Sequence, residues 1–202
     1  MIELIHMTRS FGSFNLFEDT TLSFPDHGLY LLTGDNGSGK TAFLYYLALL
    51  DKDFRGKYLF EGNRIDYLTE KRKDVFRSKN IFLMLPKGNL IDFLSVGENR
   101  NLFVKDESPY CFDSLDLKRS VLGLSGGEET LLTLSNGLSG KKKLCLLDEI
   151  TSSLSQKHVE EVMKILEKVS EKTLIILATH DSRIFGHGKK LRIENKTIHF
   201  LP

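Results

Sequence analysis

The distribution of apolar and polar residues changes period several times along the chain, and each change marks the boundary of an expected strand or helix. Short apolar or alternating segments predict strands, and the continuous apolar runs among them are typical of strands covered on both faces. The expected strands are 2–8, 20–24, 29–33, 58–60, 65–67, 81–85, 144–147 and 174–178, with a closing hairpin over 191–200. The expected helices are 41–50, 68–79, 128–138 and 156–170.

The order of these elements indicates the class of fold. Strands that alternate with helices predict an α/β domain of three layers with a mainly parallel sheet. The opening strands and the closing hairpin predict an added antiparallel β piece. Residues 86–123 hold Pro86, Gly88, Gly97 and Pro109 between short apolar patches, so short helices and loops are expected there. A chain of 202 residues is long enough for one domain with a sizeable core.

Composition narrows the classes of function. The net charge is +1, so no bulk field favours nucleic acid or an anionic membrane, and the basic clusters 71–73 and 141–143 are local and read as solvated residues. Cys111 and Cys145 lie far apart without metal-like spacing, which suits a reducing cytosol. No apolar stretch approaches the length of a membrane span, so any membrane-spanning part is expected from a separate chain.

The clearest chemistry lies in "GDNGSGKT", residues 34–41, between an expected strand and an expected helix. It matches the glycine-rich phosphate-loop pattern at every defined position, and its flanks argue against a chance glycine-rich turn. Glycines let the backbone N–H groups point inward at phosphate oxygens, and the helix N-terminus favours anions. Lys40 is expected to reach the β- and γ-phosphates of ATP, and the Thr41 hydroxyl to ligate Mg²⁺. The predicted nucleotide-binding residues of this loop are Gly34, Asn36, Gly37, Ser38, Gly39, Lys40 and Thr41.

Another apolar strand ends in two carboxylates, within "LLDEITSSLS", residues 146–155. Taken alone, the pair is equally consistent with exposed acids at the end of a strand. In phosphate-loop nucleotidases, however, an acidic strand brings an aspartate to Mg²⁺. With the phosphate loop present, Asp148 is expected in the metal shell, and Glu149 is expected to orient or deprotonate the attacking water.

A third motif, "LSGGE" at residues 124–128, is a Ser-Gly-Gly turn that enters a helix. Placed between the phosphate loop and the acidic strand, it resembles the signature motif of the ATP-binding-cassette (ABC) ATPases. "LATHD" then puts His180 after a buried strand, like the switch histidine of that family. Phe11 occupies the place where the family stacks an aromatic ring on adenine, and a core role is its alternative. The segments 50–68 and 77–102 look most like the exporter branch with macrolide, bacteriocin and lipoprotein-release systems.

The resemblance covers nearly the whole chain and implies a single ABC ATPase domain over 1–202, with a core at 1–85 and 125–202 and a reduced helical subdomain at about 86–124. It implies that two cassettes, alike or different, bind head-to-tail with each ATP between them. The signature residues Ser125, Gly126 and Gly127 would then act on the ATP held by the partner cassette. His180 would contact the γ-phosphate of the ATP held by its own cassette.

The same resemblance implies a cellular role. The chain would be the ATP-hydrolysing subunit of a transporter, at the inner face of the cell membrane, that powers export of a peptide, lipid or hydrophobic drug. A separate permease subunit would sense the ATP-driven switch through the segment near 86–104. No nucleic acid is expected as a partner. Membership in the DNA-repair or translation branches is disfavoured, because those carry a long coiled coil or a second cassette.

Five positions depart from the family pattern. Pro86 and then Lys87 stand where the family has a glutamine that contacts Mg²⁺ or water, and Leu131 stands where arginine is usual. Ile150 and Ser155 replace the usual proline and aspartate, so contact between the two sites of a dimer is expected to be altered. The departures at Pro86, Lys87 and Ser155 motivate an alternative function, a nucleotide-gated regulatory or binding subunit with little intrinsic hydrolysis.

Overall fold

The computed structural model describes residues 1–12, 14–87, 89–103 and 116–201. The strands are β1 (Ile2–Phe11), β2 (Phe14–Phe24), β3 (Gly28–Thr33), β4 (Phe54–Phe60), β5 (Asn63–Arg64), β6 (Ile81–Met84), β7 (Leu144–Asp148), β8 (Leu174–Ala178), β9 (Lys189–Glu194) and β10 (Thr197–Phe200). The helices are α1 (Lys40–Leu47), α2 (Glu70–Asn80), α3 (Val96–Phe103), α4 (Gly126–Ser139) and α5 (Gln156–Ser170), with 3₁₀ turns η1 (Val121–Gly123) and η2 (Ser182–Ile184).

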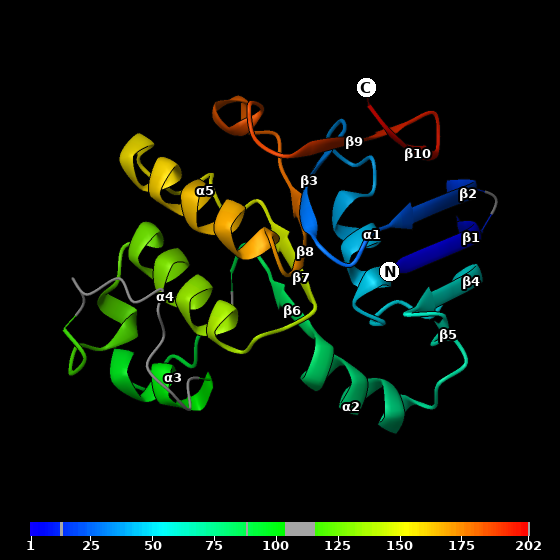
Figure 1. The fold of residues 1–202 in the computed structure, drawn as a ribbon. Helices are drawn as coiled ribbons and strands as arrows, with labels where there is room; N and C mark the ends of the chain where they lie inside the picture. The colour runs from blue at the N-terminus through cyan, green and yellow to red at the C-terminus, as the bar shows by residue number, and fades with distance from the viewer. Residues whose placement is uncertain (13, 88, 104–115, 202) are drawn as a thin grey trace.

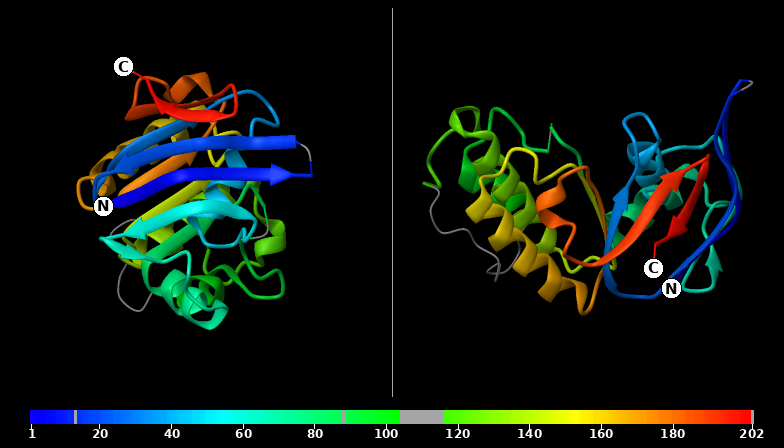
Figure 2. Two further views of the ribbon diagram at one scale, coloured as in Figure 1. Left: turned by 90° about the vertical axis from the view of Figure 1, so that its right-hand side faces the viewer. Right: turned by 90° about the horizontal axis from the view of Figure 1, so that it is seen from above.

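Two sheets organise the molecule. The central sheet has the order β10-β9-β3-β8-β7-β6, in which β9, β3, β8, β7 and β6 run parallel and only β10 pairs antiparallel. A second, antiparallel sheet has the order β2-β1-β4-β5. Helix α1 lies between the two sheets, whereas α4 and α5 cover the opposite face of the central sheet (Figures 1 and 2). The predicted α/β fold with an added antiparallel piece is therefore confirmed.

The central strands alternate between two apolar cores. Leu144 and Leu146 of β7 belong to the core around α1, while Cys145 and Leu147 belong to the core under α4 and α5. Successive side chains of a strand point to opposite faces of its sheet, so the next residue, Asp148, falls on the α1 side. The strand pattern thus places a carboxylate beside the start of α1.

Some predicted boundaries were wrong. The expected strand 65–67 is replaced by the short β5, because the Asp66 carboxylate accepts a hydrogen bond from the Tyr58 N–H at 3.1 Å and bonds Arg64, which turns the chain away. The first helix ends at Leu47 rather than at residue 50, since Leu49 has a left-handed φ of 57°.

The region between β6 and α4 holds short elements, as its composition predicted. A small core joins Val96 of α3, Val121 of η1 and Leu132 of α4. The buried Asn99 amide fixes the preceding loop: its Oδ1 accepts from the Ile91 N–H at 2.8 Å, and its Nδ2 donates to the Ile91 carbonyl at 3.1 Å. Residues 104–115, including Cys111, lie outside the described part, and the division at 86–124 stays a prediction.

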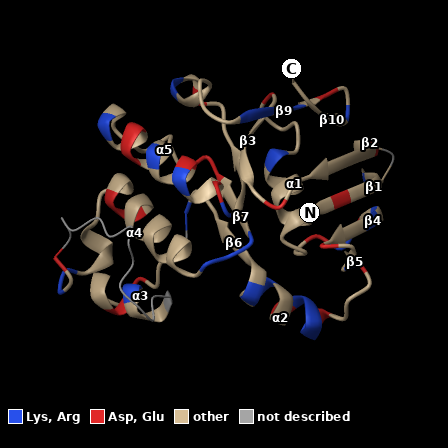
Figure 3. Ribbon diagram, viewed as in Figure 1, with Lys and Arg blue, Asp and Glu red and all other residues tan. Residues whose placement is uncertain are grey.

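The two basic clusters lie on α2 and on the loop before β7 (Figure 3). Their side chains make surface contacts within the chain: Lys73 pairs with Glu70 at 3.4 Å, and Lys143 pairs with Glu61 at 2.6 Å. Exposed pairs of this kind add little to stability. Both clusters are consistent with solvated surface residues.

Candidate active site

The loop 34–41 joins the end of β3 to the first turn of α1. Gly39 caps α1 with a φ of 103°, and a Cβ there would lie 2.7 Å from the Phe17 ring, so only glycine fits. Gly34 is equally restricted, because its Cβ would lie 2.7 Å from the Ser38 hydroxyl and 3.0 Å from the Ile193 carbonyl. The loop therefore follows a tight path that delivers it to a helix N-terminus, where anions are favoured.

Lys40 places a cation over this loop. Its side chain is buried against the loop, and Nζ donates to the carbonyls of Gly34 at 2.8 Å and Asp35 at 3.2 Å. Asn36 and Gly37 are exposed at the tip, and the buried Ser38 hydroxyl has no hydrogen-bond partner. A phosphate chain at this loop would meet a positive charge, a free hydroxyl and the positive end of α1.

Thr41 and Asp148 meet beside the loop. The Thr41 hydroxyl donates to Asp148 Oδ2 at 2.7 Å, while Asp148 Oδ1 is buried without a hydrogen-bond partner. Burial raises the pKa of the Asp148 carboxyl, and the Thr41 bond opposes that rise. A hydroxyl next to an unpaired carboxylate oxygen is a donor set suited to a hard divalent cation such as Mg²⁺. The structure thus brings together the two residues predicted to hold the metal.

Glu149 lies directly after β7, and His180 lies on the loop after β8. Glu149 follows β7 with a left-handed φ of 52°, and its N–H donates to the Ala178 carbonyl at the end of β8. Glu149 Oε2 accepts from the His180 N–H at 3.3 Å and lies 2.8 Å from His180 Nδ1. Non-glycine residues with positive φ are uncommon and gather at functional sites. The parallel strands β7 and β8 therefore present an acid and an imidazole together at one edge of the sheet.

The signature residues begin α4. Ser125 caps this helix: its Oγ accepts from the Glu128 N–H at 3.3 Å, and Glu128 Oε2 accepts from the Ser125 N–H at 2.7 Å. Ser125 and Gly126 are exposed, and Gly127 is half-buried. Helix α4 and helix α1 cover opposite faces of the central sheet (Figure 1). Within one chain the signature residues and the phosphate loop thus belong to different layers.

The positions that depart from the family pattern have ordinary structural surroundings. Leu131 and Ile150 are buried in the core under α4 and α5. Ser155 caps α5 by accepting from the His158 N–H at 3.4 Å, and Pro86 and Lys87 are exposed. The residue types at 131 and 150 therefore follow from burial, and serine at 155 follows from helix capping.

One predicted residue lies outside the described side chains, and two residues near His180 were not predicted. Phe11 ends β1, and its side chain lies outside the described part, so its contact with adenine stays a prediction. Sequence reasoning missed Asp181 and Arg183, whose side chains bond each other at 2.7–3.1 Å directly after His180. The acid–base spacing in "HDSR" signals such a pair, but only the fold shows what else the guanidinium contacts.

A parallel central sheet, a glycine-rich loop entering α1 and an acidic residue at the end of a neighbouring strand define a P-loop nucleoside triphosphatase. The family model described as ABC transporter matches residues 17–152 of the chain. The chain therefore belongs to the ABC transporter family, and it is an ABC ATPase, as its motifs predicted.

Relatives of known name place it within the family. The lipoprotein-releasing system ATP-binding protein LolD of Aquifex aeolicus is 28% identical over 186 residues, which cover 85% of this chain and 83% of the relative. The macrolide export ATP-binding/permease protein MacB of Campylobacter jejuni is 27% identical over an alignment of 206 residues. This alignment covers 95% of this chain and 32% of the relative. The chain thus spans about a third of that longer relative. These matches confirm the predicted resemblance to macrolide and lipoprotein-release systems.

Solved structures show the same fold. The ATP-binding cassette MJ0796, in a dimeric post-hydrolysis state bound to ADP and Pi, superposes with a TM-score of 0.85 at 19% identity and covers 100% of this chain and 99% of its own. Another dimeric structure of MJ0796 gives the same TM-score at 21% identity. In the part of this chain that the structure describes, no helix is long and apolar enough to cross a bilayer.

Proposed function

We propose that this chain binds and hydrolyses ATP to power export of a peptide, lipid or hydrophobic drug through a separate membrane permease. The observation that supports hydrolysis best is the meeting of Thr41 with Asp148, and of Glu149 with His180, at one edge of the central sheet. The names of the relatives, a macrolide exporter and a lipoprotein-releasing system, support export.

The residues of the loop bind and orient the nucleotide. Lys40 exchanges its bonds to the Gly34 and Asp35 carbonyls for the β- and γ-phosphate oxygens of ATP. Thr41 and Asp148 hold Mg²⁺, which supplies positive charge to the phosphates when bound. Phe11 stacks on the adenine ring.

Glu149 is the general base in this proposal. Its carboxylate follows Asp148 at the end of β7, and His180 holds it through both the backbone N–H and Nδ1. A carboxylate fixed in this way accepts a proton from the water that attacks the γ-phosphate. His180 is also the residue expected to contact the γ-phosphate within the same subunit.

Dimerisation completes the site. The exposed first turn of α4, with Ser125, Gly126 and Gly127, presents a hydroxyl and a helix N-terminus to solvent. Both features bind phosphate well, and in a head-to-tail dimer they face the ATP of the other cassette. ATP then holds two copies, or this chain and a related one, together until hydrolysis releases them.

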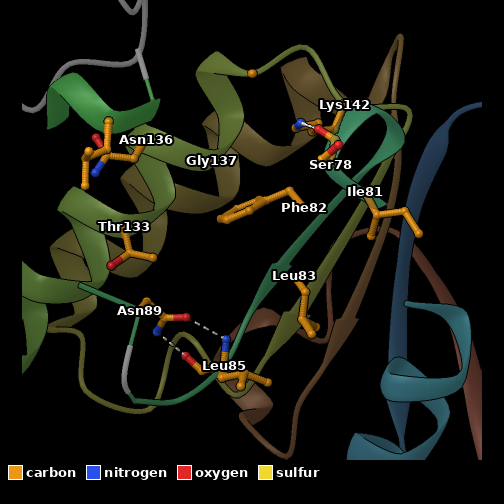
Figure 4. Close-up of a pocket in the computed structure, with 12 residues that line it drawn as sticks. Ser78, Ile81, Phe82, Leu83, Leu85, Asn89, Thr133, Asn136, Gly137 and Lys142 are labelled. Atoms are coloured by element: carbon orange, nitrogen blue, oxygen red, sulfur yellow. Dashed lines mark hydrogen bonds between the residues drawn. The ribbon is translucent and has the colours of Figure 1, made fainter. Parts of the chain in front are cut away.

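The surface near 86–104 is where we place the permease, and thereby the chain at the inner face of the cell membrane. Ile91, Phe93 and Leu102 are exposed there, Phe93 to 87%. A pocket of about 590 Å³ lies between β6 and α4, with Phe82, Asn89 and the exposed Leu102 among its lining residues (Figure 4). Exposed apolar residues next to a pocket are typical of protein contact surfaces.

Measured ATP turnover tests the proposal directly. Glu149→Gln removes the base but keeps the side-chain shape, so we expect ATP binding to persist while kcat falls by about 10²-fold or more. The control is Glu160→Gln, which changes an exposed glutamate of α5. Wild-type turnover in Glu149→Gln would show that Glu149 is not the base.

A nucleotide-gated regulatory subunit with little turnover is the alternative function. Pro86 and Lys87 support it, because neither can replace a glutamine that contacts the metal or water, and both are exposed. This function predicts ATP binding with negligible hydrolysis, even with the membrane partner present. Robust turnover by the purified protein or its complex excludes it.

A further inference from the structure

The turn at residues 151–154 follows the two acids of β7, and two of its carbonyls accept hydrogen bonds from the Arg183 guanidinium. Arg183 Nη2 donates to the Thr151 carbonyl at 2.8 Å, and Nη1 donates to the Leu154 carbonyl at 3.0 Å. The same side chain donates from Nε and Nη2 to the Asp181 carboxylate, at 2.9 and 2.7 Å. One side chain therefore ties the turn to the loop that carries His180.

The other side of this turn contacts the signature helix. Ser153 Oγ lies 3.2 Å from Thr130 Oγ1 and donates to the Gly126 carbonyl at 3.4 Å. A Cβ built at Gly126 would lie 3.4 Å from the Ser153 Cβ, an ordinary van der Waals contact, so the turn lies against the start of α4. The turn thus stands between the first turn of α4 and the loop after β8.

Only arginine suits this position. Its planar guanidinium offers donors in several directions at once, so it can bind a carboxylate and two carbonyls together, whereas a lysine ammonium is a compact charge. Thr151 and Leu154 are buried, so their carbonyls depend on protein donors. Arg183 lowers the pKa of the Asp181 carboxyl to about 2, and the pair stays charged at neutral pH.

We propose that Arg183 is a positioning residue for ATP hydrolysis. It fixes the turn 151–154 against the His180 loop, and through Ser153 it fixes the start of α4, so that Glu149, His180 and the signature residues keep a constant relative geometry. The role rests on the proposed hydrolysis of ATP. Because Arg183 bonds backbone carbonyls of the turn, the contact is independent of the side chain at position 155.

Steady-state kinetics provide the first test. In Arg183→Ala we expect kcat to fall by about tenfold or more, since small displacements of catalytic groups are costly. The KM for ATP should stay within about twofold, because Lys40 and Thr41 are untouched. Arg183→Lys keeps the charge without the fork and should give an intermediate kcat. The matched control is Arg192→Ala, which removes an exposed guanidinium that pairs with Glu194 at 3.3 Å.

Hydrogen exchange of the nucleotide-free protein provides a test that does not depend on catalysis. In Arg183→Ala, the amides of residues 150–156 and 126–130 should exchange faster than in wild type, while Arg192→Ala leaves them unchanged. The Leu154 N–H, which donates to the Thr151 carbonyl at 3.1 Å, reports on the turn directly. If Arg183→Ala does not fold, Arg183→Lys gives the same comparison.

The outcomes separate the two proposals. A kcat for Arg183→Ala within about twofold of wild type, or a fall in kcat with unchanged exchange at the turn, overturns the positioning role. Equal losses in kcat for Arg183→Ala and Arg192→Ala overturn it as well. If wild type itself hydrolyses no ATP, the proposed function fails, and the exchange data alone decide whether Arg183 holds the turn.

Discussion

Gly137 offers the sharpest prediction about how α4 sits on the central sheet. A Cβ built at this helical glycine would lie 1.9 Å from Cζ of Phe82 and 2.1 Å from its Cε1. Figure 4 shows the Phe82 ring, which belongs to β6, pointing towards Gly137 of α4. Ordinary contacts of a Cβ begin near 3.4 Å, so Gly137→Ala requires the ring or the helix to move by about 1.5 Å.

Two opposing effects determine how much Gly137→Ala changes the free energy of unfolding. Alanine favours the helix over glycine by about 0.5–1 kcal/mol. Overpacking of a well-filled contact costs about 1–3 kcal/mol, and the pocket beside Phe82 gives the ring some room to shift. The clash prevails, and we expect Gly137→Ala to lower the free energy of unfolding by about 1 kcal/mol, which lowers Tm by about 2–4 °C in a chain of this size.

In a protein that already carries Phe82→Leu, Gly137→Ala should stabilise the fold instead of destabilising it. Without the ring, the added methyl meets no obstacle, so Gly137→Ala should raise the free energy of unfolding by about 0.5–1 kcal/mol. Denaturant unfolding of the four proteins of this double-mutant cycle measures both values. Gly186→Ala is the control, since a Cβ there meets nothing within 4 Å. A Gly137→Ala protein more stable than wild type, or an equal loss in both backgrounds, would refute the reasoning.

Two further predictions concern carboxyl groups of the site. Asp148→Asn keeps an oxygen for the Thr41 hydroxyl but removes a charge that burial disfavours. Because burial raises the pKa of Asp148 in the folded state, the variant should have a higher Tm than wild type at neutral pH and lose this advantage below the ordinary pKa of 3.8. Its Tm should not rise when Mg²⁺ and ATP are added. A lower melting temperature at neutral pH would contradict this. Asp181 has its folded-state pKa lowered to about 2, so its contribution is present above pH 3.8 and is lost as pH falls through about 2. Asp181→Asn should therefore destabilise the protein at neutral pH and less so in acid, as measured by denaturant unfolding across pH; a cost independent of pH would exclude the ion pair as its cause.

The sequence predicted the parts of the site that depend on local patterns. The phosphate loop is contiguous, and its lysine and threonine follow from a fixed spacing. The acids of β7 follow an apolar run whose period of two also decides which face each side chain takes. Local information was therefore sufficient to predict where Lys40, Thr41 and Asp148 lie in the fold, and their roles stay predictions.

Contacts between distant segments were beyond the reach of such patterns. Arg183 bonds carbonyls 29 and 32 residues earlier in the chain, and Gly137 meets a ring of another strand. The opening strand was predicted too short, because β1 continues to Phe11 through register shifts against β2 between Met7 and Arg9 and between Arg9 and Ser10. A bulge of this kind interrupts the alternation on which strand prediction depends.

The alternation of β7 has a consequence for how this chain can change over time. Leu144 and Leu146 share a face with Asp148, so the number of residues in the strand determines which way the carboxylate points. Deleting one leucine would turn the Asp148 carboxylate towards the core under α4 and α5 and move Glu149 into the register that faces Thr41, although every motif could still be read in the sequence. Substitutions among the apolar residues of β7 are therefore tolerable to the degree that they fill the same space, whereas insertions and deletions are not. Strand length, counted in single residues, is itself an inherited property of this nucleotide site.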